Sequence, residues 1–463
     1  MSKLPAEAVR KQIIGLIPVY MNVFMMGCAN GWLPNVMYFM MHGQEVHATS
    51  GQCALIASFS ELGRIIFAIP AGILTDKYGR KNITVIIGFL HFFTWLGLSL
   101  NTSLVTIYIG RLVLGAVTAM VNATALISIG EIASPENRGQ LTSIYRIFMH
   151  IGAILPSIIS VTFSAYKSLA WAITIFSIIS LLSMFWVVET PSFLISVSKL
   201  EQARVILQEI RQGYQQSDIN NEFEKLRKYI EDEKARKSQL SWLKFLKSKA
   251  IRRPLFTGTL LNFFTIATGG ILIRIYITAV IPPHEFLPKK YYPLILQIIL
   301  LFIAFTSTFY IDKFPRRIIS LFGASALMVT NAVCALTSYL EMENQIGDTF
   351  KCYFILSTIL SIIFYGASIQ PMSSTIKAEL YPQAVKGFCG SVGVISQSIS
   401  AIILYQVYNF IKDHFHIYII YVIFSINSFI LFLVTYFLLP EARGVFLTDL
   451  QMKFKGNPQS NNV

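Results

Sequence analysis

The sequence predicts an all-α membrane protein, with twelve transmembrane helices arranged as two six-helix halves and joined by a cytoplasmic helical linker. Of the 463 residues, 54% are hydrophobic and 13% are charged, whereas charged residues make up about a quarter of a soluble domain. Apolar runs recur along the chain, and each is long enough to cross about 30 Å of hydrocarbon as a helix. A charged hexapeptide, Asp76–Lys81, has a degraded counterpart at Asp312–Arg317, and apolar runs flank both.

The apolar runs divide the chain into two sets of six. The first set covers residues 13–39, 52–74, 82–101, 104–130, 140–164 and 168–188, and the second covers 254–281, 291–311, 317–340, 351–376, 387–411 and 417–439. Helix is required because lipid cannot satisfy backbone N–H and C=O groups, and the runs lack the length and alternation of barrel strands. We therefore expect an N-terminal half at 1–188, a linker at 189–253, a C-terminal half at 254–440 and a tail at 441–463.

Lysine and arginine gather in one set of loops. These loops hold the charged hexapeptide Asp76–Lys81, which we call the hinge, the start of the fifth run at Arg138, the central segment, and the pair Arg316 and Arg317. The opposite loops hold few basic residues. Basic loops face the cytoplasm, so both termini and the linker are expected there, in a multi-pass protein of the plasma membrane. The same loops explain the net charge of +14, and no basic face with interleaved aromatics indicates nucleic-acid binding.

The linker is expected to be helical and amphipathic. Its apolar residues recur at helical spacing, namely Leu200, Ala203, Ile206, Leu207 and Ile210, and residues 225–237 mix charges as a solvated helix face does. The favoured interpretation is a surface helical segment between the halves. The alternative is a basic segment that docks on lipid or on a partner.

Two further motifs accompany the hinge. Glu131–Gly139 follows the fourth run, and Glu379–Gly387 follows the tenth with its basic residue and glycine in the same register. Charges at a membrane boundary are costly when unpaired, so these groups are expected to pair where helix ends converge and to lock the cytoplasmic ends in one conformation. The predicted gating network comprises Asp76, Arg80, Arg111, Glu131, Arg138, Glu189, Asp312, Arg316, Arg317, Glu379, Lys386 and Glu441.

This ordered set of motifs resembles the sugar porter branch of the major facilitator superfamily. The hinge resembles that family's Asp-Arg-x-Gly-Arg-Arg motif, Gly110–Gly115 its Gly-Arg-x-x-x-Gly motif, and Pro440–Gly444 its Pro-Glu-Thr-Lys-Gly motif. Gly31-Trp32-x-Pro34 is similar to the insect trehalose and hexose facilitators. The resemblance implies that solute binds near the membrane midplane between the halves, and that rocking of the halves exposes it to each side in turn.

The substrate site departs from that family. The resemblance implies glutamine, asparagine and tryptophan at positions that here hold Arg146, Phe264 with Thr265, Gly270, Met372, and Ser396 with Gln397. Amides both donate hydrogen bonds to sugar hydroxyls and accept them, and most of these amides are replaced. The candidate substrate-binding residues are Arg146, His150, Asn262, Phe264, Thr265, Gly270, Gln370, Met372 and Gln397.

Ionisable residues stand in mid-span at Glu61, Arg64, Arg146, His150 and Arg274. Such residues are functional hypotheses by default, although Glu61 and Arg64 are one helical turn apart and can pair with each other. Arg146, His150 and Arg274 would line a cavity with positive charge and suit an anionic or carboxylate-bearing solute. The sequence therefore leaves two substrate classes open, a neutral sugar and an organic anion.

The favoured function is facilitative transport of a sugar, either trehalose or a hexose. Proton-driven relatives in that family carry an aspartate in the first span, and residues 19–38 contain no acidic residue here, which leaves Glu61 as the one candidate for proton coupling. The alternatives are a carrier of the same fold for an organic anion, and a non-transporting solute sensor. No nucleophile with a base, phosphate loop or metal-ligand cluster indicates an enzyme, a cofactor or a metal, so the expected partners are a small solute and the lipid bilayer.

Overall fold

Helices make up every regular element that the structure describes. The structure is a computed structural model, and it describes residues 5–41, 45–134, 137–163, 165–239, 249–282, 288–310, 313–343, 348–373, 381 and 386–439. Within these residues, eleven helices are long and apolar enough to cross a membrane, and one bent pair of helices supplies a twelfth span. The predicted all-α membrane fold with twelve spans is therefore confirmed.

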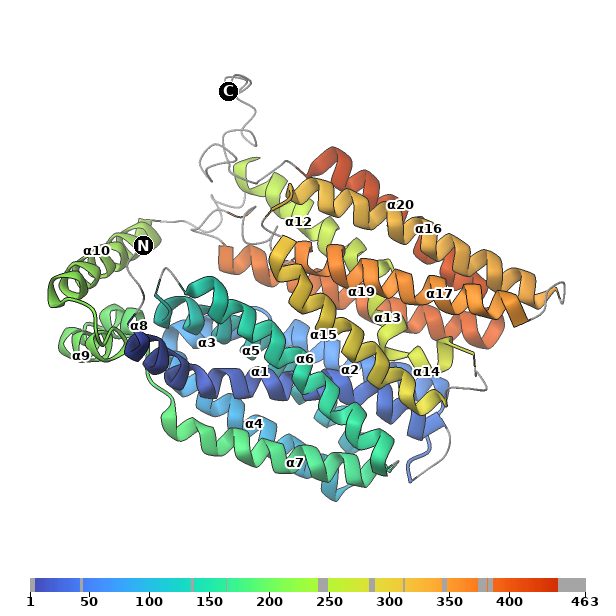
Figure 1. The fold of residues 1–463 in the computed structure, drawn as a ribbon, viewed down its shortest axis with the longest axis horizontal. Helices are drawn as coiled ribbons and strands as arrows, with labels where there is room; N and C mark the ends of the chain where they lie inside the picture. Colours follow the sequence, from blue (N-terminus) through green and yellow to red (C-terminus); the bar gives the residue numbers. More distant parts are fainter. Residues whose placement is uncertain are drawn as a thin grey trace.

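The spans form two groups that lie side by side (Figure 1). The first group contains α1 (Ala6–Met41), α2 (Ser50–Phe67), α3 (Pro70–Tyr78), α4 (Arg80–Leu100), α5 (Leu104–Ile132), α6 (Arg138–Phe163), α7 (Tyr166–Ser183) and the short η1 (Met184–Trp186). The second group contains α12 (Lys249–Ala267), α13 (Gly270–Ile275), α14 (Ile277–Val280), η2 (Lys289–Tyr291), α15 (Tyr292–Tyr310), α16 (Arg316–Met342), α17 (Asp348–Phe364), η3 (Tyr365–Ile369), α19 (Lys386–His414) and α20 (Tyr418–Leu438).

Between the groups come the linker helices α8 (Pro191–Ser196), α9 (Leu200–Ile210) and α10 (Gln216–Gln239), which lie at one end of the bundle (Figure 1). They have an apolar cluster of their own, to which α9 contributes the buried Ala203, Leu207 and Ile210. The cluster faces inward and charged residues face outward, as the sequence pattern predicts. We call this the linker end of the molecule and the opposite end the far end.

The linker is fastened to the N-terminal half by buried polar contacts. Gln12 of α1 donates a hydrogen bond to the hydroxyl of Ser134 at 2.7 Å and another to the carbonyl of Ile210 at 3.1 Å. Arg211, which is 3% exposed, donates to the carbonyl of Ile132 at 2.8 Å and forms an ion pair with Glu222 at 2.9 Å. The Arg211 guanidinium thereby satisfies a carbonyl at the end of α5 that has no partner within its helix.

Two predicted spans are interrupted in the N- and C-terminal halves. The run 52–74 is divided into α2 and α3, which meet at an angle of 51°. Pro70 opens α3, and a proline cannot continue a helix because it lacks the N–H group and clashes with the preceding turn. The run 254–281 is divided at Gly269, whose φ of +91° is left-handed.

A third predicted span changes its helix type. The run 351–376 begins as α17 and widens into the five-residue π-helix η3 before a further helical turn. One-turn π-helices are rare, and they are frequent at functional sites. Each of these three breaks lies within a run that reads as continuous, because apolar composition reports the length of a span and not the course of its backbone.

Glycines allow close contact between neighbouring spans. A Cβ atom on Gly31 of α1 would overlap the backbone carbonyl of Ala153 in α6, and one on Gly115 of α5 would overlap that of Ser60 in α2. Small residues are favoured in such contacts because helices in lipid associate by close packing rather than by exclusion of water. The glycine of the Gly-Trp-x-Pro sequence is therefore explained by packing.

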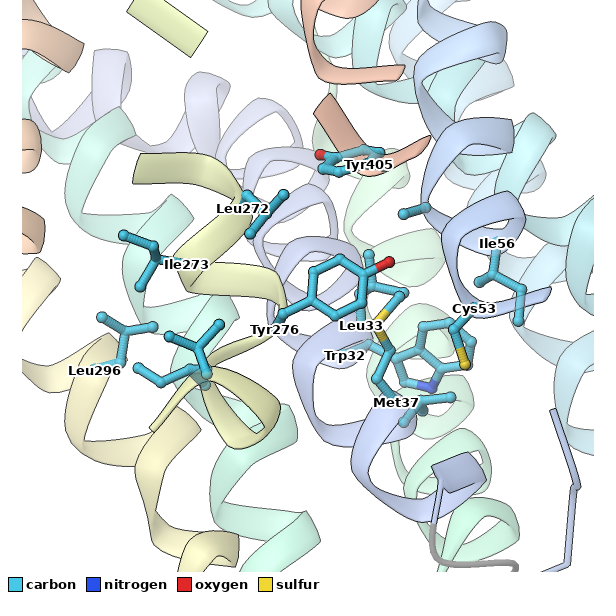
Figure 2. Packing of buried hydrophobic residues seen from close by; sticks show 14 of the residues in the cluster. Trp32, Leu33, Met37, Cys53, Ile56, Leu272, Ile273, Tyr276, Leu296 and Tyr405 are labelled. Atoms are coloured by element: carbon cyan, nitrogen blue, oxygen red, sulfur yellow. The ribbon is translucent and has the colours of Figure 1, made fainter. Parts of the chain in front are cut away.

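One apolar cluster joins the two halves, and it lies at the far end. This far-end core combines residues of α1 and α2 with residues of α13, α15 and α19 (Figure 2). Its central members are Trp32, Leu33, Met37, Cys53, Ile56, Leu272, Ile273, Tyr276, Leu296 and Tyr405. Toward the linker end, the described residues instead form two separate apolar clusters. The buried residues of one run from Leu16 to Tyr145, and those of the other run from Ile251 to Leu439.

We predict that Gly269→Ala destabilises the protein. An alanine there must adopt a left-handed φ, and its methyl group would overlap the ring of Phe424. The expected cost is about 1–3 kcal/mol, seen as a lower melting temperature of the purified protein in detergent. Gly97→Ala is the matched control, because Gly97 lies within α4 and a Cβ there meets nothing within 4 Å. Equal melting temperatures for the two variants would contradict the role of Gly269.

Candidate substrate site and charged network

The hinge at the linker end is organised around one arginine. Arg80 donates two hydrogen bonds to the carboxylate of Glu131, from Nε at 3.1 Å and from Nη2 at 2.9 Å. Asp76 lies 3.5 Å from the same guanidinium. The side chains of Arg80 and Glu131 are only 12% and 18% exposed, so this two-pronged pair is shielded from water, where charge-assisted hydrogen bonds are strong.

A second carboxylate fixes the hinge from the start of the linker. Glu189 accepts hydrogen bonds from the backbone N–H groups of Arg80 at 3.0 Å and of Lys81 at 3.2 Å. It therefore caps the N-terminus of α4, where the helix dipole favours negative charge. Gly79 is required beside it, because its φ is +90° and a Cβ atom there would overlap the Glu189 carboxylate.

The structure brings only some of the predicted network together. Asp76, Arg80, Glu131 and Glu189 meet, whereas Arg138 is exposed at the start of α6. In the second half, Arg316 is 8% exposed, and Arg317 donates a hydrogen bond to the carbonyl of Tyr436 at 2.5 Å and stacks on its ring. The described residues exclude Asp312, Glu379 and Glu441, and they include only the backbone of Lys386.

Arg111 does not join the linker-end network, which corrects that part of the sequence analysis. It stands twenty residues before Glu131 on the same helix, which is about 30 Å along the axis at 1.5 Å per residue. Its guanidinium donates to the carbonyl of Ala29 at 3.1 Å and lies 5.9 Å from the ring of Trp32. The spacing in the sequence already implies this separation, because both residues belong to one uninterrupted helix.

Charged and aromatic side chains converge between the halves, at the inner edge of the far-end core. We call this set the central polar cluster. The N-terminal half contributes Glu61 and Arg64 from α2, Arg111 from α5, and Arg146 and His150 from α6, and the C-terminal half contributes Arg274 from α13, Tyr365 and Gln370 at η3, and Tyr405 from α19. Electrostatic interactions link these residues across the boundary between the halves.

One acid–base pair lies within the central polar cluster. Arg64 donates from a single nitrogen to both carboxylate oxygens of Glu61, at 2.9 and 3.1 Å. Glu61 is 6% exposed. The pairing of residues one helical turn apart agrees with the expectation from sequence. The charges of Glu61 and Arg64 also reach Tyr365 and Tyr405 on the opposite half.

The other cations of the cluster come from both halves. Arg274 lies 3.5 Å from the side-chain oxygen of Gln370, and its Nε has no hydrogen-bond partner among the described residues. His150 is 6% exposed, its Nδ1 is likewise without a partner, and it interacts electrostatically with both Arg146 and Arg274. Of the predicted site residues, Gln370 contacts Arg274, and His150 interacts electrostatically with both Arg274 and Arg146.

The other amide side chains among the predicted site residues, Asn262 and Gln397, lie inside the C-terminal half. Asn262 donates to the carbonyl of Gly258 at 2.6 Å and accepts from the hydroxyl of Ser373 at 2.9 Å, and Gln397 donates to that hydroxyl at 3.1 Å. Asn262, Thr265 and Met372 line a cavity of about 20 Å³ inside the C-terminal half. That volume holds about one water molecule, so these residues are too enclosed to bind a sugar in this conformation.

The glycine and phenylalanine candidates have packing roles. Gly270 lies directly against the ring of Tyr365, where a Cβ atom would overlap it. Phe264 packs against the apolar cluster of the C-terminal half at the linker end. Sequence reasoning missed Tyr365 and Tyr405, because a tyrosine in an apolar run resembles core. Among the described residues, no group of three or more His, Cys, Asp or Glu side chains converges as metal ligands.

The family follows from comparison of the whole chain. A profile of the family described as "Sugar (and other) transporter" matches residues 13–454. The chain belongs to this sugar transporter family. The suspected sugar porter relationship is thereby confirmed, and the family consists of membrane carriers rather than enzymes.

Individual relatives are distant but cover nearly the full length. The glucose transporter GlcP of Staphylococcus epidermidis is 21% identical over 435 residues, which are 93% of this chain and 94% of the relative. The facilitated trehalose transporter Tret1 of Apis mellifera ligustica is 23% identical over 450 residues, covering 96% of this chain and 88% of the relative.

Solved structures with the same fold include the proton:xylose symporter XylE of the major facilitator superfamily. Its complex with 6-bromo-6-deoxy-D-glucose superposes with a TM-score of 0.72 at 16% identity and covers 97% of this chain and 99% of that chain. An inward open conformation of XylE from E. coli gives a TM-score of 0.77 at 16% identity and covers 96% and 99%. The fold of this sugar transporter is therefore the major facilitator fold.

We predict that Arg80 and Glu131 are energetically coupled. In a double-mutant cycle with Arg80→Ala, Glu131→Ala and both together, the double variant should be less destabilised than the sum of the single variants by about 0.5–3 kcal/mol. The physical reason is that either single change leaves a shielded charge without its partner. Chemical or thermal unfolding in detergent measures the cycle, and strictly additive losses would refute the coupling.

Proposed function

We propose that this sugar transporter moves its substrate passively across the plasma membrane, and that the substrate is trehalose or a hexose. The observation that carries the proposal is the position of the central polar cluster, between two halves that share an apolar core only at the far end among the described residues. A solute site between two rocking halves is the arrangement that alternating access requires. The relatives that are named as glucose and trehalose transporters support the substrate class.

The Lys and Arg distribution supports an orientation with the linker end in the cytoplasm. Both termini would then be cytoplasmic, and the far-end core would close the path from the outside. We divide the chain accordingly into an N-terminal half, a cytoplasmic linker, a C-terminal half and a cytoplasmic tail. In that orientation, uptake would require the far-end core to separate.

The far-end core is built in a way that permits separation. Among the described residues, three hydrogen bonds join the halves at this end: Gln406 donates to Ser58 at 3.0 Å, Lys412 to Ser50 at 3.3 Å, and Lys290 to the carbonyl of Val161 at 3.5 Å. Most of the contact is apolar, and it also encloses the hydroxyls of Tyr276 and Tyr408, which have no hydrogen-bond partner among the described residues. Each such buried group costs about 1–3 kcal/mol, and water entering on separation would satisfy it.

Newly satisfied polar groups would therefore offset part of the apolar contact that is lost on opening. At the linker end, the Arg80–Glu131–Glu189 contacts tie α4 and α5 to the linker. In the described residues these contacts lie within the N-terminal half and the linker. We infer that they make this half move as one body during the rocking motion.

The positions of the acidic residues support passive transport. The first span carries none between residues 19 and 38. Glu61 accepts two hydrogen bonds from Arg64, so its carboxylate is already engaged within its own helix. We therefore assign Glu61 a structural role beside the site and not that of a proton carrier.

Uptake by purified protein in liposomes tests the proposal. We expect saturable uptake of radiolabelled trehalose or hexose that depends on the protein and reaches equilibrium with the external concentration. Because no proton carrier is assigned, an inward acid gradient or a protonophore should change the initial rate of uptake by less than about twofold. That is well below the tenfold change that a free-energy difference of about 1.4 kcal/mol produces. Protein-free liposomes are the control. Accumulation above the external concentration that requires a proton gradient would overturn the passive mechanism.

A further inference from the structure

The two halves also touch on the linker side of Glu61, where α19 packs along α2. The hydroxyl of Ser391 in α19 donates a hydrogen bond to the backbone carbonyl of Ala68 at 2.8 Å. Ala68 lies about two helical turns beyond Glu61 toward the linker end, whereas the bond from Gln406 to Ser58 lies on the far-end side of Glu61. Hydrogen bonds between α2 and α19 therefore flank Glu61 on both sides.

The acceptor is a carbonyl at the bend in the second span. Helix α2 ends at Phe67 and α3 begins at Pro70, so Ala68 lies between two helices that meet at 51°. Carbonyls at the end of a helix lack partners within that helix, and Ala68 is only 8% exposed. A buried carbonyl without a partner is costly, and Ser391 supplies a donor to this one from the opposite half.

The donor has a second acceptor within its own helix. The Ser391 hydroxyl also lies 3.1 Å from the carbonyl of Gly387, one turn earlier in α19. A hydroxyl carries one hydrogen, so it bonds fully to only one of the two carbonyls at a time. When the halves separate here, the hydrogen can turn to Gly387, because serines in helices readily donate to the carbonyl four residues before them. The bond to Ala68 can therefore break without leaving the hydroxyl unsatisfied.

The N-terminal half has a serine at the equivalent position of its own motif. Ser143 follows Gly139 by four residues, just as Ser391 follows Gly387. Ser143 makes the same bond within its helix, to the carbonyl of Gly139 at 3.0 Å. Among the described residues, its hydroxyl has no hydrogen bond to the C-terminal half. The contact between the halves is therefore specific to Ser391 and the α2 bend, and the repeated motif alone does not produce it.

We propose that Ser391 is a positioning residue that controls opening of the linker end. Its bond to Ala68 holds α19 against the bend while the far-end core is closed. Transfer of the hydrogen to Gly387 releases this flank of the molecule and permits the linker ends of the two halves to move apart. The inference rests on the rocking motion of the proposed function, and it does not depend on which sugar is carried.

Distances between spin labels at Lys81 and Lys313 test the proposal in the full-length protein without solute, after replacement of the exposed Cys352. Ser391→Ala removes the donor, so the population with the longer distance should rise relative to the shorter one. The expected rise is about two- to tenfold, which is the effect of losing one hydrogen bond. Ser391→Thr keeps the hydroxyl and should restore the original distribution.

Ser143→Ala is the matched control, because it removes a serine with the same bond inside its own helix. It should leave the distribution unchanged. An unchanged distribution in Ser391→Ala protein overturns the proposal. An equal shift in Ser143→Ala protein, or a threonine variant that behaves like the alanine variant, overturns it as well.

A second variant tests the direction of the effect. Gln406→Leu removes the hydrogen bond to Ser58 on the far-end side. It should lengthen the distance between labels at Asn101 and Asp413 at the far end, and Ser391→Ala should not. Lengthening of the far-end distance in both variants would mean that the halves loosen as a whole, and it would overturn the role of Ser391.

Uptake in liposomes separates this inference from the proposed function, because the labels report motion in the absence of solute. Absence of sugar uptake, with the expected shift in Ser391→Ala protein, would overturn the proposed function alone. Saturable sugar uptake, with an unchanged distribution in Ser391→Ala protein, would overturn the role of Ser391 alone.

Discussion

The far-end core around Trp32 and Tyr276 is the contact on which the arrangement of the molecule depends. It is the apolar cluster through which the two halves of the described chain share a core (Figure 2). Toward the linker end each half has its own cluster. Apolar contacts have no fixed partners and can separate and re-form, so this core is suited to act as a gate with a closed and an open arrangement.

Because each half is rigid, the far-end core can open and close by motion of one half against the other. Close contacts at Gly31 and Gly115 hold neighbouring spans together, and the Arg80–Glu131–Glu189 contacts fasten the linker to the N-terminal half. The central polar cluster then lies where motion of the halves changes its surroundings most. Its arginines come from both halves, so the free energy of closing the site depends on what occupies it.

Most of the fold could be predicted from the sequence, because twelve apolar runs and a duplicated charged motif depend on composition and spacing alone. The hinge residues Asp76 and Arg80 also meet Glu131 as expected, since short loops bring the three to one membrane boundary. The candidate site was harder to predict. Asn262 and Met372 turn into the C-terminal half instead, because the direction of a side chain depends on helix rotation and on breaks such as Gly269, which spacing in a sequence does not specify.

The central claim is that the far end and the linker end open in alternation, and distances between spin labels test it most directly. One pair would join exposed residues of the two halves at the linker end, Lys81 and Lys313, and the other Asn101 and Asp413 at the far end, after replacement of the exposed Cys352. Saturating solute should shift the two distance distributions in opposite directions. Two distributions that stay unchanged, or that widen together, would contradict the account.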